Sequence, residues 1–203
     1  MNATLIGKIQ QLQIQQSRLK VGEGESRYYH TAPILPIAAL RLTPAGVIGL
    51  LDKVEYLDVH HQDHPETRNG FQRGKFNGVS INFSSHYRRM GSQFGNSDEV
   101  GYAGENILVE SEDAFSQEAL AAGLIIENSK GQRIILSQVS VAAPCVPFSK
   151  YMLAESGPVA AEVIRDTLQF LDKGTRGFYC HWEGKPIVIR VGDKVYLKTE
   201  AGH

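Results

Sequence analysis

The chain has 203 residues, of which 42% are hydrophobic and 21% are charged, as in ordinary globular domains. Its formal net charge is -1 and its isoelectric point is about 6.7, so no basic field points to nucleic acid or to anionic lipid. No apolar stretch is long enough for a membrane span, the N-terminal residues lack the pattern of a signal peptide, and two cysteines cannot make a disulfide framework. We therefore expect a cytoplasmic protein that forms one domain over residues 1–203.

Short strands dominate the predicted elements. Alternating apolar and polar residues over 5–14 predict a first strand with an irregularity near Gly7. Further strands are expected in a pair within 46–59 and at 79–83, 107–109, 124–127, 134–141, 186–191 and 194–198. Helices are expected at 84–90 with Ser84 or Ser85 as the cap, at 116–122, and from Pro158 to Gly174 with Ser156 as the cap. Polar stretches at 60–75 and 91–104 predict long loops, so the fold expected is mainly β, a β-barrel with a few inserted helices.

Cys145 follows the predicted strand 134–141 and stands between two prolines, Pro144 and Pro147. A reactive thiol needs a rigid and partly open position, and a strand end provides one. The alternative is a small buried cysteine that only packs. The position makes Cys145 the first candidate for a nucleophile or a metal ligand.

A glycine-bearing segment, Gly101-Tyr-Ala-Gly104-Glu105-Asn106, precedes the strand at 107–109. Glycines allow close approach of the backbone to a ligand, and successive amides can bind an anion. Gly104, Glu105 and Asn106 are therefore candidate ligand-binding residues. The alternative is a tight turn in which Asn106 satisfies its own loop.

Three further segments carry polar or reactive side chains. Arg176 follows the last predicted helix and could hold a phosphate or a carboxylate, whereas Cys180 alternates with aromatic residues and is expected to pack. His60, His61 and His64 with Asp63 invite a metal site, although their spacing matches no common zinc signature. Mixed charges over 53–58 predict a solvated strand face.

The order of these motifs resembles a MOSC domain, the module named after the C-terminal domain of molybdenum cofactor sulfurase. The resemblance rests on Gly104-Glu105-Asn106, the Pro-Cys145 strand end, the Arg176-Gly-Phe-Tyr segment and Gly192-Asp193. It is best over residues 76–198 and implies a β-barrel with inserted helices.

The resemblance implies two roles for Cys145. As a sulfur carrier, the chain would accept sulfur from a pyridoxal-phosphate cysteine desulfurase and deliver it to molybdenum cofactor (molybdopterin) or another metal–sulfur centre. As a reductase of N-hydroxylated compounds, it would bind molybdenum cofactor with Cys145 as the molybdenum ligand, and Gly104, Glu105, Asn106 and Arg176 would hold the cofactor. A non-catalytic binding barrel and a histidine-metal hydrolase are the remaining alternatives.

The chain departs from the family where positive charge is expected near the thiol. Ala142 stands where members often have an arginine, residues 146–148 are apolar where a basic residue is usual, and His86 replaces an acidic residue. Both losses of positive charge disfavour a thiolate unless another cation replaces them. The candidates for that replacement are Lys150, Arg88, Arg89 and Arg176.

Overall fold

The computed structural model describes residues 2–67, 78–95 and 99–199. The first strands are β1 (Ala3–Gln15), β2 (Lys20–Val21), β3 (Tyr28–Tyr29), β4 (Ile34–Ile37), β5 (Ala39–Thr43), β6 (Gly46–Leu51) and β7 (Val54–Leu57). The later strands are β8 (Val79–Phe83), β9 (Ile107–Glu110), β10 (Leu124–Glu127), β11 (Arg133–Val141), β12 (Phe178–His181), β13 (Ile187–Arg190) and β14 (Lys194–Lys198). The helices are the short 3-10 helix η1 (Gly24–Ser26), α1 (Ser84–Phe94), α2 (Val146–Met152) and α3 (Ala161–Leu171).

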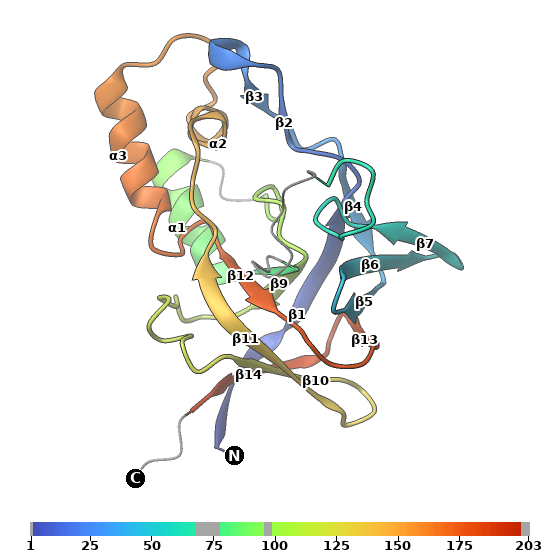
Figure 1. The fold of residues 1–203 in the computed structure, drawn as a ribbon. Coiled ribbons are helices and arrows are strands. Elements are labelled where there is room, and N and C mark those ends of the chain that lie inside the picture. Colours follow the sequence, from blue (N-terminus) through green and yellow to red (C-terminus); the bar gives the residue numbers. More distant parts are fainter. Residues whose placement is uncertain (1, 68–77, 96–98, 200–203) are drawn as a thin grey trace.

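Seven strands close into a barrel, which confirms the mainly β fold predicted from the sequence (Figure 1). Their order is β14-β10-β11-β12-β8-β9-β1, and β14 also pairs with β1. Every pair is antiparallel except β8 and β9, which are parallel. A second sheet, β13-β5-β6-β7, contributes Leu40, Leu42 and Ile189 to the same apolar core as the barrel. Closure satisfies the backbone groups of strands that would otherwise lie at an edge.

Strand β1 joins the parts of the barrel because it pairs with β14, β9 and β4 in turn. The predicted irregularity near Gly7 is confirmed as a register shift between Leu5 and Gly7, and a second shift lies between Ile9 and Gln11. A Cβ at Gly7 would lie 1.9 Å from the carbonyl oxygen of Glu110, so only glycine fits there. The bulges change which side chains of β1 face the barrel interior.

Helix α1 begins where predicted, but its expected cap is wrong. The N-cap residue is Phe83, and no side chain caps the helix. The Ser84 hydroxyl donates to the carbonyl of Ser111 at 3.0 Å, and the Ser85 hydroxyl donates to that of Asp113 at 2.7 Å. Both hydroxyls therefore tie the helix to the segment after β9 instead of capping it.

Two predicted helices differ from the structure. Residues 117–122 form turns instead of the predicted helix, and Leu120 N donates to the carbonyls of Ser116 and Gln117. Helix α3 begins at Ala161, three residues after Pro158, with Ala160 as its N-cap. The segment 153–160 instead connects α2 to α3.

Helix α2 was not predicted, and it matters because it begins directly after Cys145. Its first turn contains Pro147, a residue favoured at the start of a helix. Phe148 and Met152, four residues apart, form its buried face. That combination was the sequence signal for a helix here.

Candidate functional site

A cavity of about 540 Å³ opens beside the ends of β11 and β12. Its wall comes from the chain after β1, from β3, from the loop after β7, and from the segments before β9 and β12. The charged or ionisable side chains on the wall are Arg18, Lys20, Arg27, Tyr29, His60, Glu66, Glu105, Arg176 and Tyr179. Four cations and two carboxyl groups face one space, so the cavity suits an anionic ligand.

The glycine-bearing segment reaches the cavity because β1 holds it in place. Gln13 Nε2 donates to the carbonyl of Gly101 at 2.7 Å, and Gln15 Nε2 donates to that of Gly104 at 2.5 Å. Both glycines have positive φ, +83° and +82°, where other residues are strained. Gly104 and Glu105 line the cavity, as a ligand-binding role for them requires.

Glu105 is a buried carboxyl group, only 4% exposed, on the cavity wall. The Tyr87 hydroxyl oxygen lies 2.8 and 2.7 Å from its two carboxyl oxygens. Burial raises the pKa of Glu105 to about 7, although the Tyr87 hydrogen bond and the charge of Arg176 act to lower it. The carboxyl group on the cavity wall therefore takes up or releases a proton near neutral pH.

Arg176 provides a positive charge near Cys145, where Ala142 replaces the arginine expected from the family resemblance. Its Nη1 donates to the carbonyl of Ala143 at 2.7 Å, and its guanidinium lies 4.8 Å from the Phe148 ring centroid. Burial alone would lower the pKa of this guanidinium, yet the pKa is raised. The groups that raise it are Tyr179, Tyr29 and Cys145.

The other cations considered as replacements lie on helix α1 or α2. Arg88 pairs with Glu112 at 3.2 Å, and Arg89 lies 5.7 Å from the ring centroid of Phe170. Neither lines the cavity, and neither does Lys150. Of the four cations, Arg176 therefore takes the position beside the strand end.

Cys145 is half-buried between β11 and α2, where its carbonyl accepts a hydrogen bond from Ser149 N at 2.9 Å. Cys145 is not among the residues that line the cavity, but Ala142 and Ala143 just before it are. Its charge also interacts with those of Arg176 and Tyr29 on the wall, which places the thiol at the edge of the cavity. Cys180 is fully buried in the barrel core, and burial raises the pKa of its thiol to about 12. The burial of Cys180 confirms its packing role and leaves Cys145 as the accessible thiol.

Asn106 lies behind the cavity wall and is not among the residues that line it. Its Nδ2 donates to Asp58 Oδ2 at 2.9 Å, and its Oδ1 accepts from Ser80 N at 3.0 Å and Ser80 Oγ at 2.9 Å. The side chain thus connects the loop after β7 to β8. In this structure Asn106 supports the wall that Glu105 forms.

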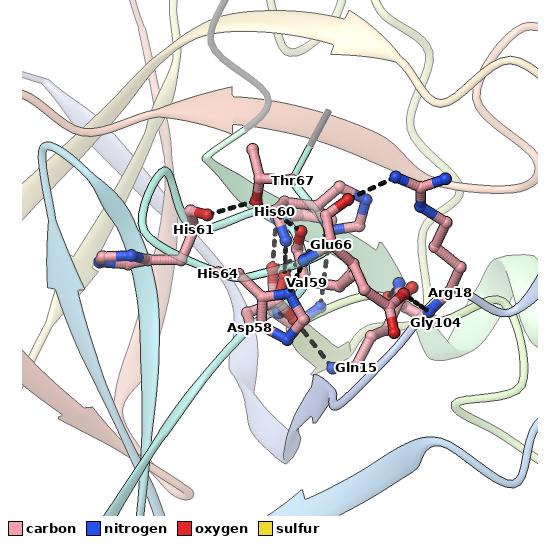
Figure 2. Close-up of polar contacts among 12 residues, drawn as sticks. Gln15, Arg18, Asp58, Val59, His60, His61, His64, Glu66, Thr67 and Gly104 are labelled. Carbon is pink, nitrogen blue, oxygen red and sulfur yellow. Dashed lines mark hydrogen bonds and ion pairs between the residues drawn. The ribbon is translucent and has the colours of Figure 1, made fainter. Parts of the chain in front are cut away.

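The solvated face predicted over 53–58 is confirmed at residues 53–55, which are exposed, but it is wrong at Asp58, which is 1% exposed. Strand β7 ends at Leu57, so Asp58 begins the following loop and turns inward (Figure 2). Burial acts to raise the pKa of Asp58, but hydrogen bonds from His60 and from Gln15 N outweigh it, and the pKa is lowered. Sequence reasoning missed this residue because its partners are distant in the chain.

The histidines at 60–64 do not converge. Figure 2 shows the His61 ring directed away from the His60 ring. Nδ1 of His61 accepts from Asp63 N at 3.2 Å, and Nδ1 of His64 accepts from Glu66 N at 3.1 Å. Across residues 2–67, 78–95 and 99–199, no three His, Cys, Asp or Glu side chains gather closely enough for a metal ion. The rest of the predicted loop, 68–75, lies outside the described residues.

Fold and site together define a class of protein, a closed β-barrel with a cation-lined cavity beside a strand-end cysteine. The MOSC domain family model matches residues 69–196, more than half of the chain, so this chain belongs to the MOSC domain family. The family is associated with molybdenum cofactor biology.

Solved structures share the fold at low sequence identity. The YuaD protein from Bacillus subtilis is 13% identical, with a TM-score of 0.56, over 95% of this chain and 95% of that one. A protein described only as hypothetical is also 13% identical, with a TM-score of 0.53, over 97% of this chain and 70% of that one. No curated protein matches the chain. None of the helices in the described part of the chain has the length and apolar character needed to cross a membrane.

Proposed function

We propose that this MOSC domain protein is a sulfur carrier. Cys145 receives sulfur from a pyridoxal-phosphate cysteine desulfurase and delivers it to molybdenum cofactor or another metal–sulfur centre. The observation that supports this is the position of Cys145, a half-buried thiol at the edge of a cavity lined by four cations. A sulfur carrier needs both parts, a thiol that a donor can reach and a place for an anionic acceptor.

The transfer step needs no external oxidant. The Cys145 thiolate attacks the outer sulfur of the desulfurase persulfide, a Cys145–sulfur bond forms, and the sulfur–sulfur bond of the donor breaks. The donor leaves as a thiolate, and Cys145 carries a persulfide. Arg176, close enough to Cys145 for the two charges to interact, would stabilise the negative charge on that sulfur.

The residues of the cavity fit an anionic cofactor. Arg27 Nε and Arg176 Nε are buried, and within the described part of the chain neither has a hydrogen-bond partner. Guanidinium N–H donors that have no partner in the protein can donate hydrogen bonds to the phosphate oxygens of a ligand. Arg27, Arg176, Gly104 and Glu105 would hold molybdenum cofactor, and Asn106 would support Glu105 from behind. When bound, the cofactor supplies a metal centre that can take up sulfur or exchange electrons.

Sulfur uptake tests the proposal directly. The protein is incubated with a cysteine desulfurase and radiolabelled cysteine, and protein-bound label is counted without reductant. We expect label on the wild type and its loss in Cys145→Ser, with unfolding by urea unchanged because Cys145 is half-buried. Arg176→Gln should accept label more slowly, since the cation beside the sulfur is gone. Equal labelling of wild type and Cys145→Ser would overturn the proposal.

A second candidate, a molybdenum-cofactor reductase of N-hydroxylated compounds, is favoured by the size and cationic lining of the cavity. It predicts stoichiometric molybdenum and pterin in protein purified from a host that makes the cofactor. Both would be lost in Cys145→Ser if that thiol binds the metal. Absence of cofactor from the wild type would contradict this candidate. Absence of sulfur uptake as well would leave a non-catalytic binding barrel.

A further inference from the structure

His60 stands on the cavity wall with one side of its ring held by a buried carboxylate (Figure 2). Asp58 Oδ1 lies 2.9 Å from His60 Nδ1 and also accepts from His60 N at 2.9 Å. The His60 side chain is 28% exposed, whereas that of Asp58 is 1% exposed. An ionised carboxylate can only accept a hydrogen bond, so a neutral His60 ring beside ionised Asp58 carries its proton on Nδ1. The other ring nitrogen, Nε2, then has no hydrogen bond among the described residues.

Asp58 is itself fixed from behind. Its second oxygen, Oδ2, accepts from Gln15 N at 2.9 Å and from Asn106 Nδ2 at 2.9 Å. These donors, together with His60, lower the pKa of Asp58 despite its burial, so it is a carboxylate at neutral pH. A chain of contacts therefore runs from Asn106 through Asp58 to the His60 ring.

We infer that His60 is the proton-transfer residue of this cavity, that Asp58 positions its ring, and that Asn106 positions Asp58. This inference rests on the proposed function, since it assumes that the cavity binds an anionic acceptor. Nε2 takes one proton from solvent, and Asp58 stabilises the resulting imidazolium. The imidazolium then donates to an oxygen of the ligand, and if the proton passes to the ligand the imidazole returns to neutral. No other bond or electron is involved.

The surroundings of His60 make its protonation depend on the ligand. The charged or ionisable groups on the same cavity are Arg18, Lys20, Arg27, Tyr29, Glu66, Glu105, Arg176 and Tyr179, with Asp58 behind the ring. Four cations oppose a further positive charge in the cavity, and an anionic ligand offsets them. Binding of an anion and uptake of a proton by His60 are thus coupled.

Nitrogen NMR of the histidine rings tests this on the unaltered protein, with inorganic phosphate as the probe. His64 is the matched control in the same loop. Its Nδ1 accepts from Glu66 N, and its Nε2 lies 3.2 Å from the carbonyl of Gln16, so it should carry its proton on Nε2. We expect the opposite tautomer, with the proton on Nδ1, for His60. The missing signal in His60→Gln assigns the ring.

Phosphate gives the second readout. Saturating phosphate should shift the Nε2 resonance of His60, because a phosphate oxygen takes up the hydrogen bond from that nitrogen, and should leave the ring resonances of His64 unmoved. A proton on Nε2 of neutral His60, or an Nε2 resonance that phosphate does not move, would overturn the inference. Sulfur uptake is counted on a different atom, Cys145 Sγ, so failure of the proposed function and failure of this inference are seen separately.

Discussion

Glu105 shows at the scale of one residue how the fold holds an unfavourable group in the cavity. Burial raises the pKa of this carboxyl group to about 7 in the folded chain, from its ordinary value of 4.5. Between these values the folded state binds more protons than the unfolded state, so the free energy of unfolding falls as pH rises from 4.5 to 7. Above pH 7 the cost is about 3 kcal/mol.

Glu105→Gln should therefore stabilise the protein at pH 8 by up to about 3 kcal/mol relative to its effect at pH 4.5. Glutamine stays neutral and can still accept the hydrogen bond of Tyr87. Urea unfolding at the two pH values measures the difference. Glu110→Gln, which removes an exposed carboxyl group at the end of β9, is the control. A Glu105→Gln effect of equal size at both pH values would contradict the account.

The residues of the site differ in how well the sequence predicts them. Gly104, Glu105 and Arg176 follow from short motifs, and the structure places all three on one cavity. Asp58 could not be predicted, because the mixed charges of its own segment indicate exposure. Its burial depends on Gln15, 43 positions away, and on Asn106, 48 positions away, which no local pattern reveals.

At the scale of an element, strand β1 and the segment 101–106 form one unit. The buried side chains of Gln13 and Gln15 on β1 donate hydrogen bonds to the carbonyls of Gly101 and Gly104. A Cβ at Gly104 would lie 2.5 Å from Leu19 Cδ1 and 2.7 Å from Gln15 Nε2. Close approach and positive φ both require glycine at this position.

Gly104→Ala should lower the free energy of unfolding by roughly 1–3 kcal/mol from backbone strain, and by about 1 kcal/mol more where the Gln15 hydrogen bond is lost. Gly192→Ala is a matched control, because Gly192 has φ +89° but no atom within 4 Å of an added Cβ. The difference between the two variants in free energy of unfolding, measured by calorimetry or in urea, gives the cost of the contacts of the added Cβ with Leu19 and Gln15. Equal losses in both would show that the packing against β1 contributes nothing.

Element boundaries were predicted well for strands and poorly where tertiary contacts decide. The strands predicted at 79–83, 124–127 and 194–198 have the observed bounds of β8, β10 and β14. The serine hydroxyls expected to cap α1 instead donate to carbonyls in the segment after β9. Helix α2 was missed because residues 146–148 were interpreted as an apolar run, although Pro147 is favoured at the start of a helix. These outcomes depend on neighbours that only the closed barrel brings together.

At the scale of the whole molecule, the free energy of unfolding depends on pH through two buried groups, His86 and Glu105, which act in opposite directions. His86 is 1% exposed, and burial lowers its pKa to about 4 from 6.5. Between these values the unfolded state binds more protons, so the free energy of unfolding falls as pH drops from 6.5 to 4, by about 3 kcal/mol. Glu105 acts in the opposite direction over much of this range.

His86→Gln should remove the loss of stability below pH 6.5 and expose the slope due to Glu105. Glutamine can still accept from Phe115 N, which donates to His86 Nε2 at 3.0 Å. Urea unfolding at several pH values between 4 and 7 would measure the change. His64→Gln, which removes a histidine ring that is not buried, is the control. An unchanged profile in His86→Gln would contradict the assignment of the neutral buried ring.

The central claim is that Cys145, and not Cys180, accepts sulfur. Peptide-resolved mass spectrometry after incubation with a cysteine desulfurase and cysteine tests it most directly. The account predicts the added mass of one sulfur atom on the peptide that carries Cys145 and none on the peptide that carries Cys180, which is buried in the barrel core. An unmodified Cys145, or sulfur on both peptides at the same rate, would contradict it.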